Sequence, residues 1–156
     1  MADRAAIVTG ASSGIGHAIA RMLGEEGYAM TLAARRPEKL QAAADELSEE
    51  GYDLQAVAAN VSDEADIQRV VAQHRERYGR LDVLVNNAGV GIGAPVGEIE
   101  TKRLDMQLDI NLRSIVLFYR ECLEMLKAAA AVSIPHLAAS VSRIAPGSRA
   151  WREEGP

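Results

Sequence analysis

The sequence predicts an α/β fold, a doubly wound parallel sheet with helices on both faces. Four short apolar runs alternate with stretches of helical periodicity, a pattern that builds a parallel sheet. The first apolar run passes through three glycines into the first helical stretch. The most distinctive polar segments follow the apolar runs directly, and parallel sheets bind ligands beyond the carboxyl ends of their strands. We therefore expect one ligand crevice at that edge of the sheet.

Composition limits the classes of function. The 156 residues fit one domain, and hydrophobic and charged fractions of 48% and 25% are ordinary for a globular protein. A net charge of −5 leaves no basic field for DNA or RNA, so no nucleic acid partner is expected. No apolar run approaches the roughly 18 residues that span a bilayer, so no membrane partner is expected either.

The single cysteine bears on the cellular compartment. Cys122 has no second cysteine with which to form an intrachain disulfide, and Met1 leads into the first strand without a signal-like apolar segment. We therefore expect a cytoplasmic protein in which Cys122 is a small core residue. The three histidines, His17, His74 and His136, have no partner at metal-ligand spacing, so no metal site is expected.

Residues 9–16 join the first strand to the first helix through three glycines. Free N–H groups of the first helical turn and the helix dipole point at such a junction, and residues without Cβ let a phosphate approach the backbone. We predict a pyrophosphate site here; an ordinary glycine-containing loop is the alternative. The candidate residues are Gly10, Ser12, Ser13, Gly14, Ile15 and Gly16. The helix is expected to carry the apolar stripe Ile15, Ile19, Met22 and Leu23.

Two arginines follow the second predicted strand, residues 29–34. Dinucleotide-binding folds often carry an acidic residue about 20 positions past the glycines, where it binds a ribose hydroxyl. Here that region offers Arg35 and Arg36 instead. A carboxylate would repel a 2′-phosphate, whereas a guanidinium binds it with charge-assisted hydrogen bonds, so NADP is favoured over NAD. A solvated basic pair at a helix start is the alternative.

The middle of the chain continues the alternation. Pro37 suits the first turn of a helix, and residues 53–59 form the third strand candidate. Ser62 is the expected N-cap of the next helix, which Gly79 closes. The fourth predicted strand covers residues 81–85.

The tetrapeptide Asn-Asn-Ala-Gly at residues 86–89 follows that fourth strand directly. Asn side chains both donate and accept hydrogen bonds, which suits them to lock neighbouring strand ends, and small residues leave room for a flat ring. A plain Asn-rich turn is the alternative. Asn60 and Val61 likewise follow the third strand, and Arg35 and Arg36 follow the second. All these segments converge on the crevice at the glycine turn.

The pattern Thr9-Gly10-x-x-x-Gly14-x-Gly16, taken with residues 86–89, resembles the short-chain dehydrogenase/reductase family, whose fold is Rossmann-like. The resemblance implies that the glycine turn holds the cofactor pyrophosphate and that Arg35 or Arg36 holds the adenosine phosphate. It places Asn60 and Val61 beside the adenine, although the family more often has Asp where Asn60 stands. The residues implied to lie against the cofactor are Asn87, Ala88 and Gly89.

The resemblance also suggests catalytic residues. From Thr101 one long helical pattern, whose course allows a break, runs to Leu126 and includes Asn111. The family places an active-site asparagine there, which holds a water in a proton relay. Ser140 stands in a segment that resembles the family's serine segment, although Arg143 occupies the place of a usual glycine. The Tyr-x-x-x-Lys pattern that the family uses for proton transfer is absent from the sequence.

The tail departs from the pattern. We expect residues 1–131 to form a dinucleotide-binding Rossmann-like domain and residues 132–156 to be a divergent or truncated tail. Pro135 would remove a ladder hydrogen bond from a central strand, which leaves a fifth strand at residues 132–139 in doubt. The sheet is therefore expected to be incomplete at its C-terminal end.

The expected function is that of an NADP-dependent oxidoreductase, which transfers a hydride between a nicotinamide cofactor and a carbonyl or secondary alcohol. NAD is the less favoured cofactor. The alternative is a non-catalytic dinucleotide-binding module or an inactive fragment of such an enzyme. The expected partners are a small carbonyl or alcohol substrate and further copies of the chain in a homo-oligomer.

Overall fold

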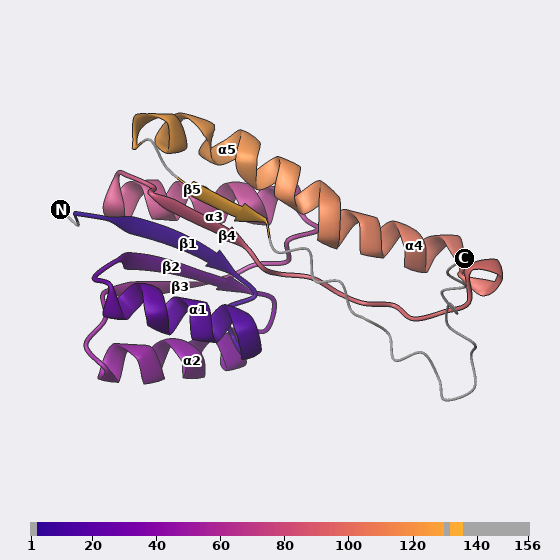
Figure 1. Cartoon of the computed structure of the whole chain (residues 1–156), viewed down its shortest axis with the longest axis horizontal. Coiled ribbons are helices and arrows are strands. Elements are labelled where there is room, and N and C mark those ends of the chain that lie inside the picture. Colours follow the sequence, from indigo (N-terminus) through magenta and orange to yellow (C-terminus); the bar gives the residue numbers. More distant parts are fainter. Residues whose placement is uncertain (1–2, 130–131, 136–156) are drawn as a thin grey trace, which may run out of the picture.

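In the described part of the chain, five parallel strands form one sheet in the order β3-β2-β1-β4-β5 (Figure 1). The computed structural model describes residues 3–129 and 132–135. Every strand pair is parallel, and β1 lies between β2 and β4, with Ile7 in register with Thr31 on one side and Leu84 on the other. This confirms the predicted fold class. The strands are β1 (Ala5–Thr9), β2 (Ala29–Ala34), β3 (Leu54–Ala58), β4 (Val83–Asn86) and β5 (Val132–Pro135).

Helices cover both faces of the sheet. Figure 1 shows α1 and α2 on one face and α3 and α5 on the other, with α4 reaching beyond the carboxyl ends of the strands. The helices are α1 (Gly14–Glu25), α2 (Pro37–Glu49), α3 (Glu64–Tyr78), α4 (Thr101–Leu108) and α5 (Ser114–Ala128). A short π-helical segment, Asp109–Arg113, joins α4 to α5, so the long helical pattern changes its hydrogen-bond spacing there but does not end.

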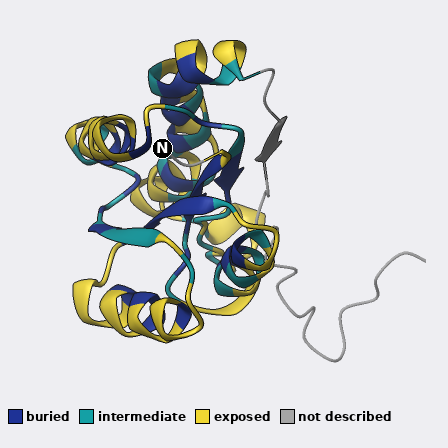
Figure 2. Cartoon of the chain, turned by 90° about the vertical axis from the view of Figure 1, so that its left-hand side faces the viewer, coloured by how far each residue is buried: buried dark blue, intermediate teal, exposed yellow. Residues whose placement is uncertain are grey.

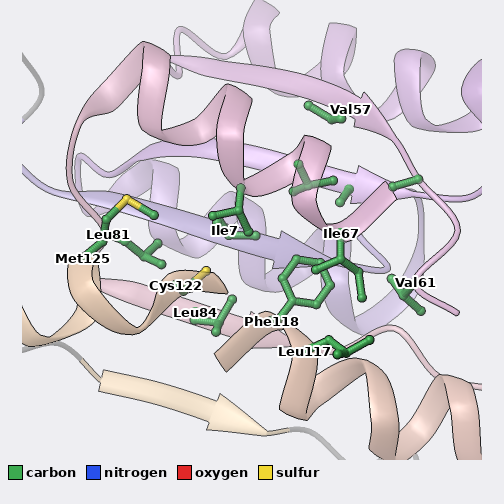
Figure 3. Packing of buried hydrophobic residues seen from close by; sticks show 14 of the residues in the cluster. Ile7, Val57, Val61, Ile67, Leu81, Leu84, Leu117, Phe118, Cys122 and Met125 are labelled. Atoms are coloured by element: carbon green, nitrogen blue, oxygen red, sulfur yellow. The ribbon is translucent and has the colours of Figure 1, made fainter. Parts of the chain in front are cut away.

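Two apolar clusters hold these layers together. All five residues of β1 are buried, as a strand covered on both faces requires; Ile7 belongs to the larger cluster, and Ala6 and Val8 belong to the other. The larger cluster packs α3 and α5 against the sheet around the fully buried Phe118, whose burial contributes about 1.5–3 kcal/mol (Figure 3). Cys122 belongs to this cluster, as predicted. The four helices that cover the sheet, α1, α2, α3 and α5, are buried on the side that faces it and exposed on the other (Figure 2).

The fifth strand, which the sequence left in doubt, forms despite Pro135. β5 pairs with β4 from Val132 opposite Val83 to Pro135 opposite Asn86. Pro135 is the last residue of the strand, and β5 is the edge strand in the described part of the chain. A proline is tolerated at an edge because the ladder loses few hydrogen bonds there.

The apolar stripe predicted for α1 is only partly buried. The side chains of Ile15 and Met22 are 59% and 65% exposed, whereas Gly16, Ala20 and Gly24 are buried. A Cβ on Gly24 would lie 2.5 Å from the ring of Tyr52, which explains why small residues occupy this face. Residues without bulk let α1 approach the sheet closely.

The N-terminus of α3 is capped one residue later than predicted. Asp63, and not Ser62, is the N-cap, and its Oδ1 accepts a hydrogen bond of 2.9 Å from the backbone N–H of Ala65. The Ser62 hydroxyl instead donates to Oδ1 of Asn60. Gly79 ends α3 with a φ of 69°, as the sequence predicted.

His74 is a satisfied core residue and not a metal ligand. The Thr31 hydroxyl accepts from Nε2 of Gln55, so it donates its own hydrogen to Nδ1 of His74 over 2.7 Å. Nε2 of His74 then donates to the Arg80 carbonyl over 2.8 Å. Burial lowers the pKa of His74 to about 4. The imidazole is therefore neutral at neutral pH, with both nitrogens bonded.

Two observations concern residues 3–129 and 132–135 as a whole. None of the helices there is long and apolar enough to cross a membrane. The same residues contain no group of three or more His, Cys, Asp or Glu side chains that could hold a metal ion.

Candidate functional site

A cavity of about 350 Å³ opens at the carboxyl ends of the strands. The chain runs outward from β1 to β2 and β3 and then crosses back to β4 on the other side of β1, so the connections diverge at this point. The predicted residues that line the cavity come from all four strand ends. They are Gly10, Ser12, Ser13, Arg35, Arg36, Asn60, Val61, Ala88 and Gly89.

The other predicted residues lie around this cavity. Gly14 and Ile15 begin α1, and Gly16 and Asn87 pack behind the glycine turn. Asn111 lies in the π-helical segment, bonded to a residue of the cavity wall. Ser140 lies outside the described residues, so its assignment stays a prediction.

The glycine turn is shaped by its lack of side chains. Gly10 and Gly14 have φ angles of 68° and 59°, a left-handed conformation that favours glycine. A Cβ on Gly16 would overlap the Gly10 carbonyl oxygen. Ser13, the N-cap of α1, makes no side-chain capping bond. The first N–H groups of α1 therefore keep their hydrogen-bonding capacity for an anion at this turn.

Thr9 and Asn87 lock the ends of β1 and β4 together. Nδ2 of Asn87 donates to the Thr9 carbonyl over 3.0 Å and to the Gly10 carbonyl over 3.3 Å. The buried Thr9 hydroxyl accepts from the backbone N–H groups of Asn87 and Ala88, at 3.0 and 2.9 Å, and donates to the Val85 carbonyl. The expected lock by an asparagine is confirmed. Sequence reasoning did not assign a role to the Thr9 side chain. Its only signal in the sequence is that a hydroxyl residue stands directly before the first glycine of the turn.

A cluster of cations forms one side of the cavity. Arg35 and Arg36 line it as predicted, and Lys39 from the first turn of α2 lies with them. In the described part of the chain these three side chains have no ion pair, and the cavity lining includes no carboxylate. Sequence reasoning missed Lys39, which lies in the first turn of α2, two residues after Pro37. The cluster suits a phosphate.

The turn between β3 and α3 is fixed by hydrogen bonds. Oδ1 of Asn60 accepts from the backbone N–H and hydroxyl of Ser62, at 3.3 and 2.9 Å. The backbone N–H of Asn60 donates to Asp66 over 2.8 Å, and this bond, with the Arg69 guanidinium, lowers the pKa of the Asp66 carboxyl. The amide of Asn60 is thus oriented by its own turn, with Oδ1 turned toward Ser62.

The opposite wall is held from the π-helical segment. Asn111 accepts at Oδ1 from the Val90 N–H over 2.8 Å and donates from Nδ2 to the Val90 carbonyl over 2.7 Å. Val90 and Ile110 both line the cavity and were not predicted. Neither has a sequence signal, because each is an ordinary apolar residue placed by tertiary packing.

These parts fit a dinucleotide. The turn at Gly10 and Gly16 has room where side chains would otherwise lie, and α1 offers an anion site beside it. The small residues Ala59, Ala88 and Gly89 leave space for a flat ring, and the cation cluster offers a second anion site. A molecule with a diphosphate, a ring and a further phosphate matches this arrangement.

Comparison with known proteins agrees with this geometry. A family model described as short chain dehydrogenase matches residues 4–144. The oxidoreductase YxjF of Bacillus subtilis (strain 168) is 40% identical over 112 residues, which cover 72% of this chain and 44% of that protein. The chain thus spans less than half the length of that curated relative.

Solved structures resemble the fold closely. An alcohol dehydrogenase from the archaeon Thermococcus sibiricus, complexed with 5-hydroxy-NADP, superimposes with a TM-score of 0.80 at 33% identity, covering 83% of this chain and 56% of that one. A short chain dehydrogenase/reductase from Burkholderia phymatum, in complex with NAD, has a TM-score of 0.76 at 28% identity, covering 78% and 43%. Structures similar to this chain thus hold either nicotinamide cofactor.

Proposed function

Because this chain belongs to the short-chain dehydrogenase family, we propose that it binds NADP in the crevice and acts in hydride transfer between that cofactor and a carbonyl or secondary alcohol. The observation that carries the choice of NADP is the cation cluster of Arg35, Arg36 and Lys39, which faces a cavity without carboxylates. A 2′-phosphate placed there would meet only positive charge.

The proposed roles follow from the position of each residue. The diphosphate would lie at the start of α1, held by Gly10, Ser12, Ser13, Gly14, Ile15 and Gly16. Asn60 and Val61 would border the adenine, and Asn87, Ala88 and Gly89 would lie along the cofactor. NADP would supply hydride chemistry at its nicotinamide ring. Asn111 and Ser140 stay predictions as catalytic residues, as does the domain boundary at residue 131.

The cofactor proposal predicts tighter binding of NADPH than of NADH. Charged hydrogen bonds to the extra phosphate contribute about 1.5–3 kcal/mol, or roughly 10- to 100-fold in affinity. The double variant Arg35→Ala/Arg36→Ala should lose this preference through weaker NADPH binding, with NADH affinity unchanged. Calorimetric or fluorescence titration measures both. Arg103→Ala, an exposed change on α4, is the control. Equal binding of NADH and NADPH by the unsubstituted chain would refute the assignment.

A second candidate function is cofactor binding without catalysis. None of the four tyrosines of the sequence has a lysine four residues later, so the family's proton-transfer pair is absent from it. Positioned acid–base catalysis contributes about 10²- to 10⁴-fold to a rate. A turnover assay with NADPH and a simple ketone, run beside the titration, separates the two functions. Both predict binding, and only the first predicts hydride transfer.

We further propose that the chain self-associates through an exposed apolar stripe on α4 and α5. Its residues recur mostly at intervals of four, so they share one helix face. They are Leu104, Leu108, Leu112, Val116 and Leu123, each 39% to 60% exposed. The stripe is flanked by side chains of both charge signs, Lys102, Arg103 and Asp105. In an antiparallel arrangement of two copies, each charged side chain could lie opposite one of the other sign.

Self-association is tested by sedimentation. The variant Leu112→Lys/Val116→Lys should sediment as a monomer at concentrations where the unsubstituted chain is a dimer or larger, because the charged groups would be buried in the contact. Met22→Lys changes an equally exposed apolar residue on α1 and should leave the assembly intact. A monomeric unsubstituted chain would disprove the proposal. A cytoplasmic location also stays a prediction.

A further inference from the structure

Residues 89–94, here called the crevice-edge segment, run from the crevice toward α4 and form neither helix nor strand (Figure 1). Exposure alternates along it: Gly89, Gly91 and Gly93 are exposed, while Val90 and Ile92 are half-buried. The N–H groups of Val90 and Ile92 both turn to the helix side. Alternation with a period of two is typical of extended backbone.

Two side-chain amides hold this segment from behind. Asn111 bonds both backbone groups of Val90, and Oε1 of Gln107 accepts from the Ile92 N–H over 3.0 Å. Positions four apart on a helix are separated by about 6 Å along its axis, and positions two apart in an extended chain by about 6.6 Å. The spacing of the amides therefore matches the spacing of the groups they bind.

We propose that Gln107 is a positioning residue, which acts with Asn111 to keep the crevice-edge segment in place as a wall of the cofactor site. The inference rests on the proposed NADP function. In the described part of the chain, the backbone of residues 89–94 makes its hydrogen bonds only to these two side chains.

The consequence of losing Gln107 follows from the neighbouring anchors. Before the segment, the Ala88 N–H is bonded to the Thr9 hydroxyl. Without Gln107, Asn111 alone would hold the residues beyond Val90. Val90 lines the cavity, so motion of the segment displaces part of its wall. Neither Gln107 nor its bond touches the cavity, so its effect on cofactor must pass through the segment.

The test uses the full chain with three substitutions. Gln107→Leu removes the acceptor, Gln107→Glu keeps a carboxylate oxygen that can accept from the same N–H, and Gln41→Leu is a matched change on exposed α2. Amide hydrogen exchange of Ile92 should be about tenfold faster in Gln107→Leu, with the amides of the β1 core unchanged. The dissociation constant of NADPH should rise about three- to tenfold. Gln107→Glu should leave the Ile92 exchange rate and the NADPH dissociation constant near the values of the unsubstituted chain, and Gln41→Leu should alter neither.

Each outcome is decisive for one part of the proposal. Unchanged Ile92 exchange in Gln107→Leu would overturn the contact. Faster exchange with unchanged NADPH affinity would overturn the positioning role and leave a purely structural bond. If the unsubstituted chain binds neither NADPH nor NADH, the proposed function fails and with it the positioning role, while the exchange of Ile92 still decides whether Gln107 holds the segment.

Discussion

Gly16→Ala is expected to lower the free energy of unfolding by about 3 kcal/mol and to weaken NADPH binding at least tenfold. A Cβ there would lie 2.9 Å from the Gly10 carbonyl carbon and still closer to its oxygen and to Nδ2 of Asn87. The gain in helix propensity from glycine to alanine, about 1 kcal/mol, is smaller than the cost of this overlap. The turn must open to relieve it, which moves the backbone that would contact the diphosphate.

Chemical denaturation and cofactor titration measure the two effects. Gly97→Ala is the matched control, because a Cβ at Gly97 meets no atom within 4 Å. It should change stability by less than about 0.5 kcal/mol and leave binding unaltered. If Gly16→Ala were as stable as Gly97→Ala, the close approach of α1 to the end of β1 would have no energetic role.

Acid is expected to destabilise the fold through His74. In the folded state the pKa of His74 is lowered to about 4 by burial, whereas an unfolded histidine titrates near its ordinary 6.5. The unfolded state therefore binds a proton that the folded state excludes, so stability falls as pH falls from about 6.5 to about 4. The difference amounts to about 3 kcal/mol, and no further loss from this group is expected below that range.

Urea unfolding at a series of pH values checks this dependence. The variant His74→Gln should start from a lower stability at pH 7, because the bonds to Thr31 and Arg80 are disturbed, but its stability should change little between pH 6.5 and 4. His17→Gln removes a histidine outside this network and should keep the decline. An equally steep decline in His74→Gln would assign the acid sensitivity to other groups.

The sequence was sufficient for the fold because alternation and periodicity report which faces are buried. Sequence patterns did not predict burial correctly where it depends on how closely two elements pack. On α1, Ile15 and Met22 have the right spacing for a buried stripe. Gly16 and Gly24, however, allow the helix to pack so close to its neighbours that the side chains of Ile15 and Met22 remain exposed. Pro135 left the fifth strand in doubt for a similar reason, because the effect of a proline depends on where the strand ends and on which strand lies beside it.

The residues of the candidate site could be predicted from the sequence where their role depends on local backbone conformation. The glycine turn and Arg35–Arg36 stand next to strand ends, and their positions at the crevice follow from the chain order. Thr9 bonds Asn87, which lies 78 residues away in the sequence. Gln107 bonds Ile92, which lies 15 residues away. Such pairs depend on the register of β1 against β4 and on the course of a loop, which periodicity does not specify.

The rate at which the buried Cys122 is alkylated can be used to measure local opening of this protein. It is the sole thiol of the chain, it is fully enclosed in the cluster beneath α5, and burial raises its pKa to about 12. Because the thiolate is the reactive species, alkylating reagents can modify it only in molecules where α5 has separated from the sheet. The labelling rate in native buffer therefore measures how often this helix detaches, without any introduced probe.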